Sequence, residues 1–128
     1  YNKTMNRRIL KTKHFARWMN KTELTDEALC LAVDEMEQGL IDADLGGNLY
    51  KKRVGLANRG KRGGVRTLLA TNLGNRWFFM FGFEKNDKAN ISNEEKEVAL
   101  GLAKELLQMP EAIINARIEL KKLEEICL

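Results

Sequence analysis

The sequence predicts a single α+β domain in which a small antiparallel or mixed β-sheet is flanked by N-terminal and C-terminal helices. Two observations support this fold class. Apolar residues near both ends of the chain recur every three or four positions, as on amphipathic helices, whereas the middle holds short runs of β-branched and aromatic residues separated by turn residues. With 128 residues and 44% hydrophobic content, the chain is long enough for one ordinary core and too short for two.

A short strand and two helices are expected first. Residues 7–11 have the length of an edge strand, and residues 14–20 can form one or two helical turns. In residues 26–40, four apolar side chains recur at intervals of four, three and four and so share one helical face: Leu29, Val33, Met36 and Leu40. Thr25 is a suitable N-cap for this helix, and Gly39 ends it.

The middle of the chain predicts three strands, at residues 49–54, 65–71 and 76–83. The last two are joined by residues 72–75, a four-residue connection that suits a hairpin. If side chains alternate along the last strand, one face holds Trp77, Phe79, Phe81 and Phe83, and the other holds Phe78, Met80 and Gly82. Both faces are then apolar, which predicts a central strand.

Two helices are expected at the C-terminal end. Ser92 and Glu95 have the spacing of a capping box, and the helix that they begin runs to Met109. Pro110 ends it and can open another helix. From there, apolar residues keep a strict three-and-four spacing through Ile113, Ala116, Leu120, Leu123 and Cys127. This narrow seam predicts one long helix that packs on the core or docks against a partner protein or a second copy.

Charge is segregated along the chain. The 39 positions from 45 to 83 hold no acidic residue and eight basic ones, whereas the whole chain has a net charge of only +4. The basic residues are Lys51, Lys52, Arg53, Arg59, Lys61, Arg62, Arg66 and Arg76. Such a segregated basic segment favours binding of a polyanion, with nucleic acid as the leading candidate.

Within this segment, three cations are expected to converge on one face of the sheet. Lys51 and Arg53 are two positions apart and share a face of their strand, and an antiparallel pairing brings Arg66 beside them. Like charges in such positions repel one another, and a bound polyanion removes that cost. Residues 58–64 between the strands form a basic hairpin loop whose glycines let the backbone approach a phosphate. The open alternatives are a solvated basic face and a solvated loop.

Other functional classes find little support. Cys30 and Cys127 lie far apart in the sequence without a metal-binding pattern, so we expect reduced, buried, structural thiols. His14 lies outside the basic segment and is expected to be a surface or satisfied residue. We expect no metal or other cofactor. The chain has no apolar run of membrane-spanning length and no secretory signal pattern, which favours a cytoplasmic location without membrane association.

The order of elements and three segments together resemble the RelE/HigB superfamily of bacterial type II toxins, in a HigB-like form. The segments are Leu-Tyr-Lys-Lys-Arg-Val at 49–54, Gly-Lys-Arg-Gly-Gly-Val-Arg at 60–66 and Phe-Gly-Phe-Glu-Lys-Asn-Asp at 81–87. The resemblance implies a RelE-like toxin domain over residues 5–109, with residues 110–128 as a helical extension of the same domain. Residues 1–4 precede Met5, which resembles an initiator, and are left outside the domain.

Members of this superfamily are metal-independent ribonucleases that cut messenger RNA in the ribosomal A site and are silenced by an antitoxin. The resemblance therefore implies an antitoxin, the ribosome and messenger RNA as partners, and the C-terminal helix adds a possible homodimer. It also implies that Lys51, Arg53, Arg66 and Lys85 are catalytic, with Lys51 or Lys85 transferring protons and the arginines holding the phosphate. The residues that would bind RNA are Lys52, Arg59, Lys61, Arg62 and Asn86.

Two departures from the superfamily pattern leave the proton-transfer assignment open. Asn86 stands where an arginine is frequent, and residues 87–93 contain no Tyr or His. Two alternative functions also stay open. Relatives that resemble ParE poison DNA gyrase, and a non-catalytic RNA-binding or regulatory module would use the basic sheet for affinity alone.

Overall fold

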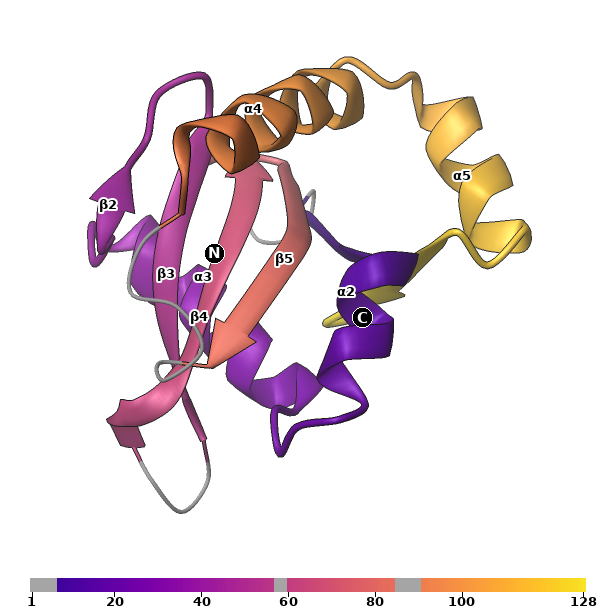
Figure 1. Cartoon of the computed structure of the whole chain (residues 1–128). Helices are drawn as coiled ribbons and strands as arrows, with labels where there is room; N and C mark the ends of the chain where they lie inside the picture. The colour runs from indigo at the N-terminus through magenta and orange to yellow at the C-terminus, as the bar shows by residue number, and fades with distance from the viewer. Residues whose placement is uncertain (1–6, 57–59, 85–90) are drawn as a thin grey trace.

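The computed structural model describes residues 7–56, 60–84 and 91–128 (Figure 1). Within these ranges, six strands form one mixed sheet in the order β2-β3-β4-β5-β1-β6. The strands are β1 (Arg8–Thr12), β2 (Ala43–Asp44), β3 (Leu49–Leu56), β4 (Gly60–Thr71), β5 (Arg76–Glu84) and β6 (Leu123–Ile126). The helices are α2 (Lys13–Met19), α3 (Asp26–Glu37), α4 (Asn93–Leu107) and α5 (Glu111–Glu119). The predicted α+β class is confirmed.

Helices cover both faces of the sheet. Figure 1 shows α3 behind the sheet and α4 crossing its front, and the buried residues divide accordingly. One cluster joins α2 and α3 to the sheet through side chains such as Phe15, Leu29 and Trp77. The second joins α4 to the opposite face through side chains such as Phe78 and Ala103. The sheet is therefore the middle layer of the domain.

The predicted helix starts are confirmed. Thr25 caps α3 because its hydroxyl accepts a hydrogen bond from the backbone N–H of Ala28 at 3.2 Å. The capping box at the start of α4 is complete: Ser92 Oγ accepts from Glu95 N–H at 3.1 Å, and Glu95 Oε1 accepts from Ser92 N–H at 2.8 Å. Both helices thus begin where short polar side chains satisfy otherwise unpaired N–H groups.

The first strand is internal to the sheet, so the edge position expected for it is wrong. β1 pairs in parallel with β5 on one side and antiparallel with β6 on the other. Its Ile9 and Leu10 are buried on opposite faces, in the two separate clusters. A strand buried on both faces needs backbone partners on both sides, and β6 supplies the second set.

The strands β3, β4 and β5 form an antiparallel meander, as predicted, and β5 is central. The expectation that its four odd-numbered aromatic residues share a face is wrong. A β-bulge shifts the register, so that Leu69 lies opposite Phe79 and Leu68 lies opposite Phe81. The extra residue is Met80. Trp77 and Phe79 consequently pack on the α2 and α3 side, whereas Phe81 and Phe83 face the α4 side.

The prediction of one long C-terminal helix is also wrong, because α5 ends at Glu119 and β6 follows. Lys121 has a positive φ of 61°, which turns the chain into the strand. Leu123 and Ile126 of β6 are then buried on opposite faces of the sheet, while Leu120 remains 67% exposed. The continuous seam on which a helix-mediated homodimer depended does not form. The domain boundary between residues 109 and 110 stays a prediction.

Polar contacts fasten this C-terminal segment to β1. Arg8 pairs with Glu125 of β6 and Glu111 of α5, at 2.8 Å and 2.7 Å. Lys11 lies 3.4 Å from Glu124. These ion pairs hold β6 in register along a strand that would otherwise expose an unpaired edge.

The two cysteines are joined, so the expectation of reduced and buried thiols is wrong. Cys30 of α3 and Cys127 form a disulfide with a Cα–Cα distance of 5.9 Å. Neither residue is fully buried, and Cys127 is exposed. Sequence separation gave no sign of this pairing because it depends on β6 returning to the side of α3.

Candidate nucleic-acid interface

Three cationic side chains lie on the α4 face of the sheet, as predicted. Arg53 of β3 and Arg66 of β4 are direct cross-strand partners. Lys51 is the partner of Leu68, two positions along the same face. This face also carries Leu49, Leu68 and Ala70, which pack in the cluster under α4. The cations therefore continue a sheet face whose other part is covered by that helix.

The two arginines differ in what surrounds them. Arg53 has a side chain that is 48% exposed, and its Nε lies 3.9 Å from Asp42 Oδ1. The other carboxylate oxygen of Asp42 accepts from the backbone N–H of Arg53 at 2.7 Å, which fixes the carboxylate beside the guanidinium. The Nη1 atom of Arg66 is buried and has no hydrogen-bond acceptor among the described residues. A buried N–H donor without an acceptor is costly, and an anionic oxygen would remove that cost.

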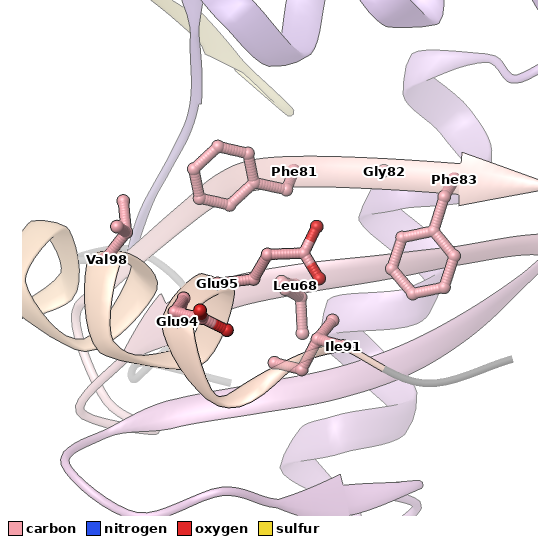
Figure 2. A pocket seen from close by; sticks show the side chains of 8 residues that line it. All are labelled: Leu68, Phe81, Gly82, Phe83, Ile91, Glu94, Glu95 and Val98. Carbon is pink, nitrogen blue, oxygen red and sulfur yellow. The ribbon is translucent and has the colours of Figure 1, made fainter. Parts of the chain in front are cut away.

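An apolar pocket adjoins the arginines on the same face. Phe83 is the cross-strand partner of Arg66, and Phe81 is the partner of Leu68. Figure 2 shows both phenyl rings projecting from β5 on this side, Phe81 toward α4 and Phe83 toward Ile91. The pocket has a volume of about 450 Å³. Sequence analysis missed this pocket because the bulge that turns both rings to this face has no clear signal in the sequence.

Lys52, expected to bind RNA, lies on the opposite face, so that expectation is wrong. Its side chain is 3% exposed and its Nζ lies 2.9 Å from Glu35 Oε1 of α3. The same Nζ donates to the backbone oxygen of Leu40 at 3.0 Å. Lys52 is therefore a buried partner that joins the sheet to α3.

The remaining predicted residues are described only in part or not at all. Arg59, Lys85 and Asn86 lie outside the described residues, and for Lys61 and Arg62 only the strand backbone is described. Gly64 has a structural explanation: a Cβ added there would lie 2.1 Å from the backbone oxygen of Val54. The sequence suggested that the glycines of a loop at 58–64 let the backbone approach a phosphate. Because β4 already begins at Gly60, Gly64 lies inside a strand, and the close approach that requires a glycine there is to the neighbouring strand β3.

The single histidine is exposed on α2, in agreement with the expectation of a surface residue. The ring of His14 meets Phe81 edge to face, with centroids 5.3 Å apart. In the described ranges, no group of three or more His, Cys, Asp or Glu side chains is arranged to hold a metal ion. None of the described helices is long and apolar enough to cross a membrane.

The sequence matches a known protein family. A family model described as the RelE toxin of the RelE/RelB toxin-antitoxin system matches residues 7–126, nearly the whole chain, including α5 and β6. Among curated proteins, none has significant similarity to the sequence. The match agrees with the mixed sheet and with the order of elements. The chain therefore belongs to the RelE toxin family of toxin-antitoxin systems.

Proposed function

We propose that this toxin is an endoribonuclease that cuts messenger RNA on the ribosome without a metal ion and so inhibits translation. The observation that supports this most directly is the pair of cross-strand arginines, one of which holds a buried N–H group that has no acceptor in the part of the chain that the structure describes. Two arginines that are cross-strand partners on one sheet face can bind a single phosphodiester, because each guanidinium can donate two parallel hydrogen bonds to phosphate oxygens. Family membership supports the same function.

The proposed reaction is attack by a ribose 2′-hydroxyl on the adjacent phosphorus. The bond between the 2′-oxygen and phosphorus forms, and the bond to the 5′-oxygen breaks, which leaves a 2′,3′-cyclic phosphate and a 5′-hydroxyl. Arg53 and Arg66 stabilise the charge that gathers on the phosphate oxygens and hold the 2′-hydroxyl in line. Lys51 and Lys85 are the candidates for the two proton transfers: a lysine in its neutral form accepts the proton of the 2′-hydroxyl, and a protonated lysine donates one to the departing 5′-oxygen.

The proposed partners follow from this reaction. A toxin-antitoxin family implies an antitoxin, which would cover the cationic face. The ribosome would help to hold the message in the geometry that the reaction needs, which a small basic sheet alone does not impose. Further contacts to RNA would come from Arg59, Lys61, Arg62 and Asn86. We place the activity in the cytoplasm, where ribosomes and messages meet.

The proposal is tested with purified ribosomes carrying a defined message in the A site. Primer extension should show cuts with the wild-type toxin and at least a roughly hundredfold loss with Arg66→Ala, the scale expected when one donor to a transition-state charge is removed. The matched control is Arg17→Ala, which removes an exposed arginine from α2. It should cut like the wild type.

The other outcomes assign different functions. Growth arrest with signs of DNA damage and uncut messages would indicate a gyrase poison. Strongly salt-dependent RNA binding without any product on denaturing gels would indicate a binding module. Full activity of Arg66→Ala would show that the proposed site is wrong.

A further inference from the structure

A second cavity lies on the α4 side of the sheet, where the C-terminal segment returns. In Figure 1, the chain runs from α4 through α5 and comes back as β6 beside α2. The cavity between these elements has a volume of about 320 Å³. Its apolar lining includes Met80 and Phe81 of β5, Leu106 of α4 and Leu123 of β6. The proposed RNA cleavage makes no use of this cavity.

Three cationic side chains line the same cavity, and each comes from a different segment. Lys13 begins α2, Arg117 lies in the last turn of α5, and Lys122 precedes β6. Backbone hydrogen bonds join the three segments. The N–H of Lys13 donates to the backbone oxygen of Lys122 at 3.1 Å, and the N–H of Lys122 donates to that of Arg117 at 2.8 Å. The fold itself therefore holds these three cations around one cavity.

The three cations lack the acidic partners that other basic residues of the domain have. Arg8 and Lys52, for example, each form an ion pair with a carboxylate at 2.8 to 2.9 Å. Within the part of the chain that the structure describes, the side chains of Lys13, Arg117 and Lys122 form no ion pair. None of the described residues that line the cavity is acidic. The cavity thus presents uncompensated positive charge around an apolar surface, which attracts an acidic ligand with an apolar part.

We propose that this cavity anchors the antitoxin, through an acidic segment that inserts an aliphatic side chain and places carboxylates against Lys13, Arg117 and Lys122. The inference rests on family membership, which implies an antitoxin, and not on the proposed nuclease activity. An acidic amphipathic helix carries both kinds of group on one face, because residues three or four positions apart are neighbours there. Phe81 lines both this cavity and the pocket beside the arginines, so a segment anchored here can continue onto the cationic face.

RNA is the competing polyanion, but the lining does not suit it. Surfaces that bind single-stranded RNA combine cations with open aromatic faces on which bases stack. The apolar lining described here is mostly aliphatic, and Phe81 already meets the ring of His14 edge to face, with centroids 5.3 Å apart. A sugar-phosphate backbone has no aliphatic side chain with which to bury such a lining. Burial of apolar surface therefore favours a protein segment.

A second copy of this chain is the other competing occupant. In a closed dimer, the same surface patch meets itself across the two-fold axis. The three cations of one copy would then face those of the other, and like charges repel. Charge complementarity therefore favours an acidic partner protein over self-association.

The test measures the affinity of the purified toxin for its antitoxin by isothermal titration calorimetry, without RNA. The antitoxin is obtained as the product of the adjacent gene that relieves the growth arrest caused by the toxin. Lys122→Glu should weaken binding at least about tenfold, because it turns a complementary charge contact into a repulsive one. The matched control is Lys21→Glu, the same change at an exposed site outside the cavity, which should bind like the wild type. Because Lys122 is exposed, its variant is expected to fold.

Two further variants examine the two parts of the contact. In the Lys122→Glu background, replacing the acidic residues of the antitoxin by lysine one at a time should identify one that restores the affinity, as expected for a direct pair. Leu102→Ala trims the lining contributed by α4 without changing the charge, and it should weaken binding several-fold. In cells, the Lys122→Glu toxin should still arrest growth but should need a higher dose of antitoxin for relief.

The inference is wrong if Lys122→Glu binds the antitoxin like the wild type, or if Lys21→Glu weakens binding equally, which would indicate only long-range attraction. A toxin dimer that Lys122→Glu dissociates would assign the cavity to a second copy. Loss of ribosome binding by Lys122→Glu, with unchanged antitoxin affinity, would assign it to RNA. Failure of the proposed nuclease is distinguishable, because growth arrest without cut messages rejects the nuclease and leaves the calorimetric result unaffected.

Discussion

Lys52 of β3 and Glu35 of α3 form an ion pair across the layer between sheet and helix, with Nζ 2.9 Å from Oε1 and side chains that are 3% and 19% exposed. Lys51, its neighbour in the strand, points to the opposite face because side chains alternate along a strand. Two identical adjacent residues thus have different tasks, and substitutions can tell them apart.

Lys52→Met should destabilise the fold by about 3 kcal/mol, because it removes one partner of a buried ion pair. Urea denaturation monitored by tryptophan fluorescence would measure the loss. Lys51→Met is the matched control: its stability should remain within ~0.5 kcal/mol of the wild type, as for most surface changes, while the proposed RNA cleavage should fall. Equal stability of both variants would contradict the assignment of Lys52 to the interior.

Gly64 and Gly101 should respond oppositely to alanine. At Gly64 the new Cβ would lie 2.1 Å from the Val54 backbone oxygen, so β3 and β4 must separate, at a cost of about 1 to 3 kcal/mol. At Gly101, in the exposed middle of α4, a Cβ meets nothing within 4 Å. Alanine there should stabilise by roughly 0.5 to 1 kcal/mol through helix propensity. Thermal denaturation checks both, and a stabilising Gly64→Ala would refute the close approach.

Local patterns were sufficient to predict most of the fold. Thr25 and the Ser92 box fixed two helix starts because capping depends on residues three positions apart. The alternation that puts Lys51 and Arg53 on one face, together with antiparallel pairing of the next strand, was sufficient to bring Arg66 beside them. Such features depend on near neighbours in the sequence.

The features that sequence analysis missed depend on residues that are far apart in the sequence. The apolar spacing of residues 113–127 fitted a helix, but the unpaired side of β1 favoured a strand at Leu123–Ile126. The disulfide followed from that return of the chain. The bulge at Met80 moved Phe81 and Phe83 to the sheet face that carries Arg66. The position of such an extra residue in a strand cannot be predicted from the residues next to it in the sequence.

The disulfide should contribute substantially to stability when it is formed. Its cysteines are 97 residues apart, for which the chain-entropy model gives about 4 to 5 kcal/mol. Adding dithiothreitol, or Cys127→Ser, should lower the melting temperature, and amide exchange should accelerate most in β6. Cytosolic proteins usually keep their thiols reduced, so thiol alkylation in cells should be compared with the oxidised protein. An unchanged melting temperature on reduction would show that α3 and β6 are held together by other contacts.

Glu111 should make stability depend on acid pH. Hydrogen bonds from Arg76, and then from Arg8, lower the pKa of this carboxyl group below its ordinary value. In the window between the two pKa values, the unfolded chain binds more protons than the folded one. The stabilisation is therefore complete above the unfolded pKa, about 4.3, and is lost as the pH falls through the folded value. Because the side chain is 55% exposed, the contribution should stay below about 1 kcal/mol.

Urea midpoints measured between about pH 6 and pH 3 would show this linkage as a steeper decline in the wild type than in Glu111→Gln. The matched control is Glu119→Gln at the end of the same helix, which removes an exposed carboxyl group and should decline like the wild type. Arg76 also donates to the backbone oxygens of Leu107 and Met109, where α4 ends, so part of the docking of α5 is independent of pH. If the Glu111 variant and the wild type decline in parallel, the carboxylate does not fasten α5 to the sheet, and those backbone contacts hold it alone.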